Sequence, residues 1–202
     1  MTDWLDACFG RVLAALGRTG HAGNTIVVFT SDHGEMFERK IWKHTTPTLY
    51  QPIIRVPLLL STPGQSTRQD VYTSTSCVDI LPTLLHLTNR QIPSWIEGLV
   101  LPPYAEQVSP SDRSIFVVEA KSSPKAAPLQ KATVAMIKGD FKLVYYFGYD
   151  GFDGVFELYN LSDDPEELDD LYASHPEMAS ALEQELTARI KQSDSPFIQS
   201  IE

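Results

Sequence analysis

The sequence predicts an α/β core over residues 1–110, followed by a smaller α+β subdomain over residues 111–202. Two observations predict this order. Near the N-terminus, a helix-like segment, a glycine-containing turn and a short apolar run follow one another, as in the back half of a βαβ unit. Beyond residue 112, several strand-like segments precede one final helix. Residues 89–112 carry four prolines and little periodicity, which predicts a long loop at the boundary.

The elements of the first part follow from apolar periodicity. Residues 2–18 place apolar side chains at steps of three and four, which predicts an amphipathic helix. Residues 24–30 are a continuous run rich in β-branched residues, typical of a strand buried on both faces in a parallel sheet. Residues 55–61 predict a second buried strand, and residues 77–88 predict a helix.

The second part predicts a meander of strands. Strand-like segments cover residues 114–120, 132–139, 141–148 and 154–161. Gly139 and Asp140 form a tight hairpin signal between the middle two. A final helix is predicted over residues 176–191, which gives a small antiparallel sheet with one helix.

Composition excludes some partners. The chain has 202 residues, of which 43% are hydrophobic, and a net charge of −10. Such a surface repels nucleic acid and anionic membranes, so neither is an expected partner. No stretch reaches the roughly 18 apolar residues of a membrane span. The N-terminus has two acids among its first six residues and no basic region, so we expect no signal peptide in this chain and assign no compartment.

Asp32 and His33 directly follow the first predicted strand, where open α/β sheets place their ligands. Adjacent strand residues point to opposite faces, so both can reach one ion only if the chain leaves extended geometry, and Gly34 permits that. A carboxylate and a neutral imidazole suit a divalent ion such as Zn²⁺ or Mn²⁺. Asp and Gly are also favoured turn formers, so an ordinary turn stays open as the alternative.

Longer words in the sequence carry a family resemblance. "NTIVVFTSDHGE", "LYQPIIRVPLLL" and "STSCVDILPTLLHLT" are followed by "IEGLVLPPY", "IKGDFKLVYY" and "ELYNLSDDPEELDDLY". In this order and spacing they resemble the C-terminal portion of the sulfatase family of the alkaline-phosphatase superfamily, over residues 3 to about 190. The resemblance implies a partial mixed sheet flanked by helices, plus a small C-terminal antiparallel sheet with one helix.

The resemblance also implies a site. Asp32 and His33 match the family's second pair of metal ligands, with calcium the usual ion and manganese or magnesium the alternatives. His44 matches the position of a cation that reaches the sulfate or phosphate group, and Lys43 beside it is the alternative. The implied activity is metal-dependent hydrolysis of sulfate esters, on a small-molecule or glycan substrate.

The implied nucleophile is missing from this sequence. The family uses a Cys or Ser, oxidised to formylglycine, in a Cys/Ser-x-Pro/Ala-x-Arg motif. Cys8 and Cys77 lack the proline, and Ser61 and Ser122 lack the arginine. We therefore expect the formylglycine and the other metal ligands outside this sequence. The isolated chain is expected to bind metal weakly and hydrolyse nothing, and an exposed sheet edge would permit self-association.

Two alternatives stay open. A phosphonate or phosphodiester hydrolase, or a phosphoethanolamine transferase, shares the Asp-His turn and differs in its nucleophile. A non-catalytic binding module is the other alternative.

Two acidic features are expected to be structural. Asp79 is expected to be a helix N-terminal acid that accepts hydrogen bonds from backbone donors, and Asp163–Asp170 is expected to form a solvated turn with a helix start near Pro165.

Overall fold

The computed structural model describes residues 2–38, 41, 47–105 and 112–198. The chain divides into two compact units. One comprises residues 1–34 and 55–70, and the other comprises residues 35–54 and 71–202. The boundary predicted near residue 110 falls among residues 106–111, outside the described residues, and stays a prediction.

The first unit holds one helix and a pair of short strands. Helix α1 (Thr2–Arg18) forms where the amphipathic pattern predicts it. After a 3-10 turn, η1 (Ala22–Asn24), strand β1 (Val27–Thr30) pairs with β2 (Leu58–Ser61). Phe9 of α1 packs on Phe29 of β1, with ring centroids 4.8 Å apart.

The expectation of a parallel strand buried on both faces is wrong for this pairing. β1 and β2 run antiparallel, with Val27 opposite Ser61 and Thr30 opposite Leu58. Phe29 and Leu59 keep 37% and 63% of their surface exposed. A β-branched run indicates that a strand forms, but it does not encode the direction of the strand beside it.

The second unit is built on a four-stranded antiparallel sheet in the order β3-β4-β5-β6. Its strands are β3 (Ser114–Glu119), β4 (Ala132–Lys138), β5 (Phe141–Phe147) and β6 (Val155–Asn160). Gly139 has φ +56° in the β4–β5 turn, which explains why glycine stands there. The predicted meander is confirmed.

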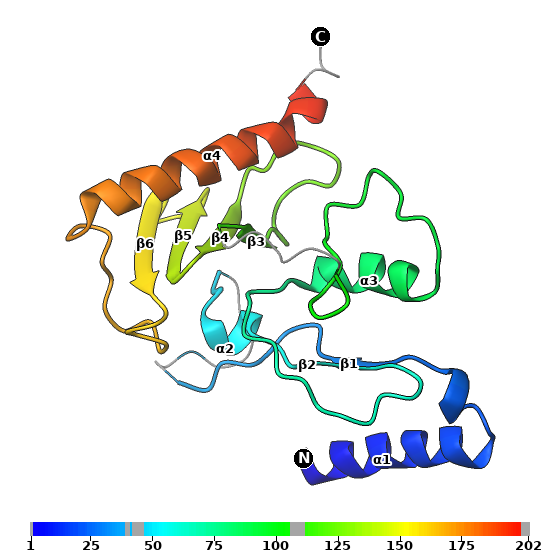
Figure 1. Cartoon of the computed structure of the whole chain (residues 1–202). Helices are drawn as coiled ribbons and strands as arrows, with labels where there is room; N and C mark the ends of the chain where they lie inside the picture. The colour runs from blue at the N-terminus through cyan, green and yellow to red at the C-terminus, as the bar shows by residue number, and fades with distance from the viewer. Residues whose placement is uncertain (1, 39–40, 42–46, 106–111, 199–202) are drawn as a thin grey trace. The chain divides into compact units, whose positions relative to one another are not determined.

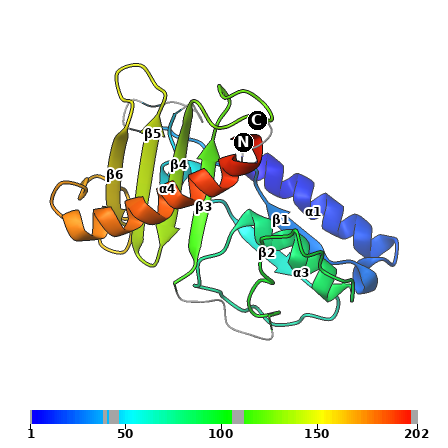
Figure 2. The same cartoon turned by 90° about the horizontal axis from the view of Figure 1, so that it is seen from above.

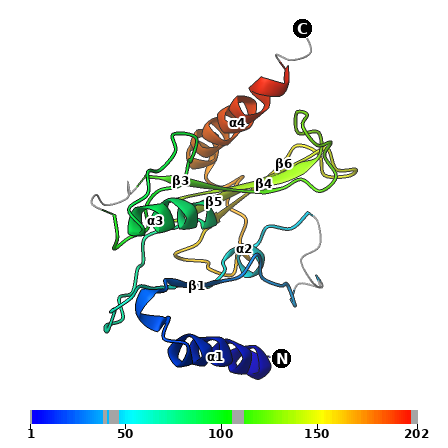
Figure 3. The same cartoon turned by 90° about the vertical axis from the view of Figure 1, so that its right-hand side faces the viewer.

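Helix α4 (Pro176–Ile198) crosses one face of this sheet (Figures 1 and 2). Its buried side chains complete an apolar core with those of β4, β5 and β6: Ala132, Val134, Met136, Leu143, Leu158, Ala179, Leu182 and Leu186. The short helix α2 (Gln51–Ile54) lies against the opposite face, as the edge-on view of the sheet shows (Figure 3). The sheet therefore has two covered faces.

The helix predicted over 77–88 is also present. It consists of a 3-10 turn, η2 (Cys77–Asp79), continued by α3 (Ile80–Leu87). Asp79 joins the two. Among the described residues, no helix is long and apolar enough to cross a membrane.

Candidate functional site

Asp32 and His33 lie just past β1, as the sequence predicts, where the backbone makes a tight turn with a bend at Asp32. Their side chains converge: His33 Nε2 lies 3.7 Å from Asp32 Oδ2. The turn is held by local hydrogen bonds. Ser31 Oγ donates to the His33 carbonyl at 2.6 Å, and the His33 backbone N–H donates to Asp32 Oδ1 at 3.0 Å. The chain has thus left extended geometry, so adjacent side chains reach the same side.

The two side chains suit a shared divalent ion. Bonds of about 2.0–2.4 Å to one ion at an angle near 100° place two donor atoms about 3–4 Å apart, which the observed separation matches. His33 Nδ1 lies 2.9 Å from the Gly34 carbonyl oxygen. A proton donated from Nδ1 to this carbonyl places the lone pair on Nε2, the atom that faces Asp32.

The charge state of Asp32 also suits metal binding. The hydrogen bond from the His33 backbone N–H is the largest of the effects that lower the pKa of Asp32 below its ordinary value of 3.8. The carboxyl group is therefore ionised at neutral pH. Most of its surface is open to solvent, with 87% of the side chain exposed.

Asp32 and His33 supply two ligands, and the described residues contain no group of three or more His, Cys, Asp or Glu side chains that could hold an ion. Ca²⁺ takes six to eight oxygen ligands, so this pair is an incomplete site for it. Lys43 and His44 lie within residues 42–46, outside the described residues, and the role of His44, or of Lys43, at the sulfate or phosphate group stays a prediction.

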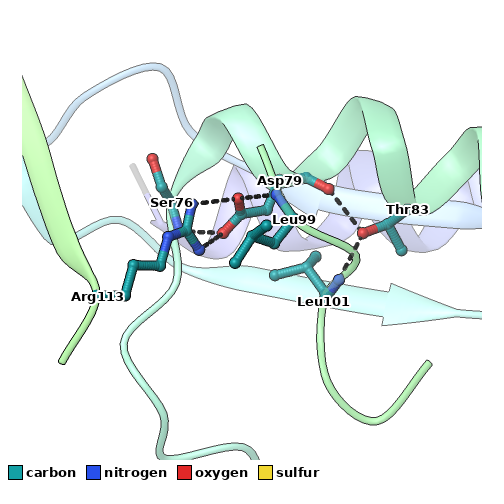
Figure 4. Close-up of polar contacts among 6 residues, drawn as sticks. All are labelled: Ser76, Asp79, Thr83, Leu99, Leu101 and Arg113. Carbon is teal, nitrogen blue, oxygen red and sulfur yellow. Dashed lines mark hydrogen bonds and ion pairs between the residues drawn. The ribbon is translucent and has the colours of Figure 1, made fainter. Parts of the chain in front are cut away.

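Asp79 serves the fold, as expected from its position at the start of a helix. Its side chain is 1% exposed and accepts backbone N–H bonds from Ser76 at 2.8 Å and Leu99 at 2.9 Å (Figure 4). Arg113 adds a bidentate ion pair through both terminal nitrogens, at 2.7 and 2.8 Å. Four donors thus converge on one buried carboxylate, leaving no open position for chemistry.

Thr83 extends this network by one turn of α3. Its hydroxyl donates to the Asp79 carbonyl at 2.6 Å and accepts from the Leu101 amide at 2.8 Å (Figure 4). Gly98 lies so close to this helix start that an added Cβ would stand 2.1 Å from the Val78 carbonyl oxygen. The segments "VDILPT" and "IEGLVL" therefore pack against each other and share hydrogen bonds, and we call this contact the joint.

Lys142 and Glu167 form a buried ion pair that the sequence pattern did not predict. Glu167 belongs to the acidic run that was expected to be solvated, yet it is 1% exposed and pairs with Lys142 of β5. The run forms turns, and α4 begins only at Pro176, so the expected helix start near Pro165 is wrong. The strand pattern did indicate that Lys142 is buried. Lys142, Val144 and Tyr146 occupy alternate positions of β5 and so share one face, and Val144 and Tyr146 belong to an apolar cluster.

The sulfatase family profile matches residues 1–90. Arylsulfatase K of Xenopus laevis is 34% identical over 188 residues, which is 90% of this chain and 34% of the relative. This chain is a member of the sulfatase family. Because the match to arylsulfatase K covers 90% of this chain, it reaches beyond the profile into the C-terminal sheet.

Solved structures agree on the fold. A protein in complex with its substrate D-glucosamine-2-N,6-O-disulfate has a TM-score of 0.67 and 26% identity, over 92% of this chain and 38% of that one. The phosphonate monoester hydrolase of Silicibacter pomeroyi has a TM-score of 0.74 and 25% identity, over 94% and 39%. The chain spans about a third of the length of the curated relatives it matches.

Proposed function

We propose that this sulfatase-family chain takes part in the metal-dependent hydrolysis of sulfate esters. The observation that carries the proposal is the convergence of His33 Nε2 and Asp32 Oδ2, 3.7 Å apart, in the stretch matched by the sulfatase profile. In this proposal Asp32 and His33 are metal ligands. Calcium is the proposed ion, with manganese and magnesium as the alternatives.

The proposed chemistry assigns separate tasks to the chain's own residues. Ester hydrolysis develops negative charge on the sulfate oxygens and on the leaving oxygen. A bound divalent ion would stabilise the charge on the sulfate oxygens. His44, with Lys43 as the alternative, donates to the leaving oxygen or pairs with the sulfate group. The nucleophile, proposed as a formylglycine, is not encoded by any Cys or Ser motif in this sequence.

Sulfated sugars are the proposed substrate class. The support is the relative solved with D-glucosamine-2-N,6-O-disulfate, which matches 92% of this chain. A phosphonate or phosphodiester hydrolase is the second candidate, favoured by the match to a phosphonate monoester hydrolase. The phosphoethanolamine transferase and non-catalytic module alternatives differ in the residues outside this sequence.

Paramagnetic Mn²⁺ tests the proposed ligands even if binding is weak. In NMR spectra of the purified chain, we expect substoichiometric Mn²⁺ to broaden resonances of the Asp32–His33 turn first. The variant D32N/H33A should lose this broadening, whereas H21A, at an exposed histidine in the same unit, should retain it. Broadening centred on Asp163–Asp170 with none at Asp32 would contradict the assignment.

Hydrolysis is tested separately. We expect no turnover of an aryl sulfate by the isolated chain above the H33A control, because the nucleophile motif is absent from it. The intact mass of the native protein, with the 5′ end of its transcript, decides between the alternatives. An upstream Cys/Ser-x-Pro/Ala-x-Arg motif supports the sulfatase, and an upstream Thr nucleophile supports a phosphoryl enzyme. The absence of an upstream half supports a binding module.

A further inference from the structure

The buried pair of Lys142 and Glu167 contacts more than its own two residues. Both side chains are 0% exposed, and Lys142 Nζ lies 2.5 Å from Glu167 Oε1. Lys142 Nζ also donates to the Leu49 carbonyl at 2.6 Å, and Glu167 Oε2 accepts the Gln51 backbone N–H at 2.6 Å. The pair therefore holds two backbone groups that flank a single residue, Tyr50.

Tyr50 is held by the same face of the sheet. Its hydroxyl donates to Glu157 Oε2 at 3.4 Å. Its ring packs on that of Tyr159 in a T-shaped arrangement, with ring centroids 6.3 Å apart. Leu49 and Ile53 are 5% and 6% exposed. The segment Leu49–Ile54 is thus fixed to the face of β4, β5 and β6 that lies opposite α4 (Figure 3).

The segment has little regular structure of its own. α2 has four residues, too short to be stable by itself. Apolar side chains in place of Lys142 and Glu167 would fill the same volume, and such replacements of buried ion pairs are often tolerated. They could not satisfy the Leu49 carbonyl or the Gln51 amide. Glu167 has φ +56°, which L-residues seldom adopt, and this conformation accompanies a side chain aimed at backbone groups.

The segment Leu49–Ile54 follows Lys43 and His44 closely in the chain. Leu49 follows His44 by five residues and Lys43 by six. We propose that Lys142 and Glu167 are positioning residues: they fix the segment Leu49–Ile54 and so anchor the C-terminal side of the stretch that carries Lys43 and His44. This inference rests on the proposed function for the role of those two residues. It assigns the C-terminal sheet a part in fixing the segment that follows Lys43 and His44 in the chain.

Amide hydrogen exchange of the full chain tests the positioning role. In K142M/E167L we expect protection of the Gln51 amide to fall about tenfold or more, while amides paired between β4 and β5 keep theirs within about twofold. K142M/E167Q retains a neutral acceptor and should recover part of the protection at Gln51. A pair that only filled the core would leave Gln51 unchanged or would loosen the whole sheet equally, and either result overturns the proposal.

A matched control uses the other lysine pair of the same sheet. Lys138 and Glu185 lie 2.7 Å apart, half-buried, on the α4 side. K138M/E185L should leave the exchange of Gln51 unchanged, and so should H44A, since anchoring does not require the imidazole. Titration of the His44 ring with inorganic sulfate then tests the proposed function by itself. If the His44 ring does not respond to sulfate while the hydrogen exchange of the Gln51 amide changes as predicted, the role of His44 is refuted and the anchoring is established.

Discussion

Arg113 and Asp79 form a bidentate ion pair at the start of α3, with nitrogen–oxygen distances of 2.7 and 2.8 Å. The residues are 34 positions apart in the chain. Arg113 directly precedes β3, so the pair connects the helix with the first strand of the C-terminal sheet. The Ser76 and Leu99 amides complete the partners of the carboxylate.

Replacing Asp79 by Asn should lower the free energy of unfolding by about 3 kcal/mol, because it leaves the Arg113 guanidinium without its counter-charge in a mostly buried position. Chemical denaturation monitored by circular dichroism measures this. The control is D70N, which breaks an exposed pair with Arg68 and should cost less than about 1 kcal/mol. Equal losses in the two variants would contradict the structural role of Asp79.

Asp79 also predicts acid sensitivity. Burial raises the pKa of its carboxyl group, but the hydrogen bonds from Arg113, Leu99 and Ser76 outweigh burial, and the pKa lies below the ordinary value of 3.8. A lowered folded-state pKa stabilises the protein above pH 3.8, and this stability is lost as the pH falls through the folded-state value. Stability measured from pH 6 downward should therefore fall less steeply below about pH 4 for D79N than for the wild type. Parallel curves would show that Asp79 does not couple folding to protonation.

Gly98 should not tolerate a side chain. The Cβ of alanine would stand 2.1 Å from the Val78 carbonyl oxygen, so the backbone would have to move and weaken the Leu99–Asp79 bond. We expect G98A to destabilise the protein by about 2 kcal/mol. G10A is the matched control, because nothing lies within 4 Å of its new Cβ in α1, and it should stabilise by about 0.5–1 kcal/mol. Thermal unfolding of both variants decides the matter, and a neutral G98A would show that the joint can relax.

Tyr172 predicts a loss of stability at alkaline pH. Burial, followed by the hydrogen bond to Glu183 and the charge of that residue, raises the pKa of Tyr172 to about 12. A raised folded-state pKa stabilises the protein below the ordinary value of 10.0, and this stability is lost as the pH rises from there to about 12. Y172F should show a shallower decline over that range. Y72F, at a tyrosine that is 92% exposed, is the control and should follow the wild type.

Divalent ions should stabilise the isolated chain very little. Two ligands at the Asp32–His33 turn predict a dissociation constant of about 1 mM or weaker. Binding at that affinity adds at most about 0.4 kcal/mol at about 1 mM Ca²⁺. The melting temperature should therefore change by less than about 2 °C between Ca²⁺ and EDTA. A larger shift that D32N/H33A abolishes would mean that this chain supplies further ligands.

Much of the fold was predictable because periodicity survives in a single sequence. The helix over 2–18 and the strands from 114 to 161 appear at nearly their predicted bounds. The convergence of the Asp32 and His33 side chains just past the strand was predictable as well, although the backbone bends at Asp32 rather than at Gly34. The roles of Lys43 and His44 rest on the family resemblance, and both residues lie outside the described part of the chain.

What the sequence determined by itself was local: amphipathic segments, the Gly139–Asp140 turn, and the chemistry of the Asp-His pair. The tertiary structure decided which distant groups meet. Residues far apart in the chain decide the strand direction of β1 and the burial of Glu167 within an acidic run. They also decide the hydrogen bonds that Lys142 and Glu167 make to the backbone of Leu49 and Gln51. The physical reason is that burial and hydrogen-bond partners are properties of the packed chain, whereas periodicity records only which face of a segment is apolar.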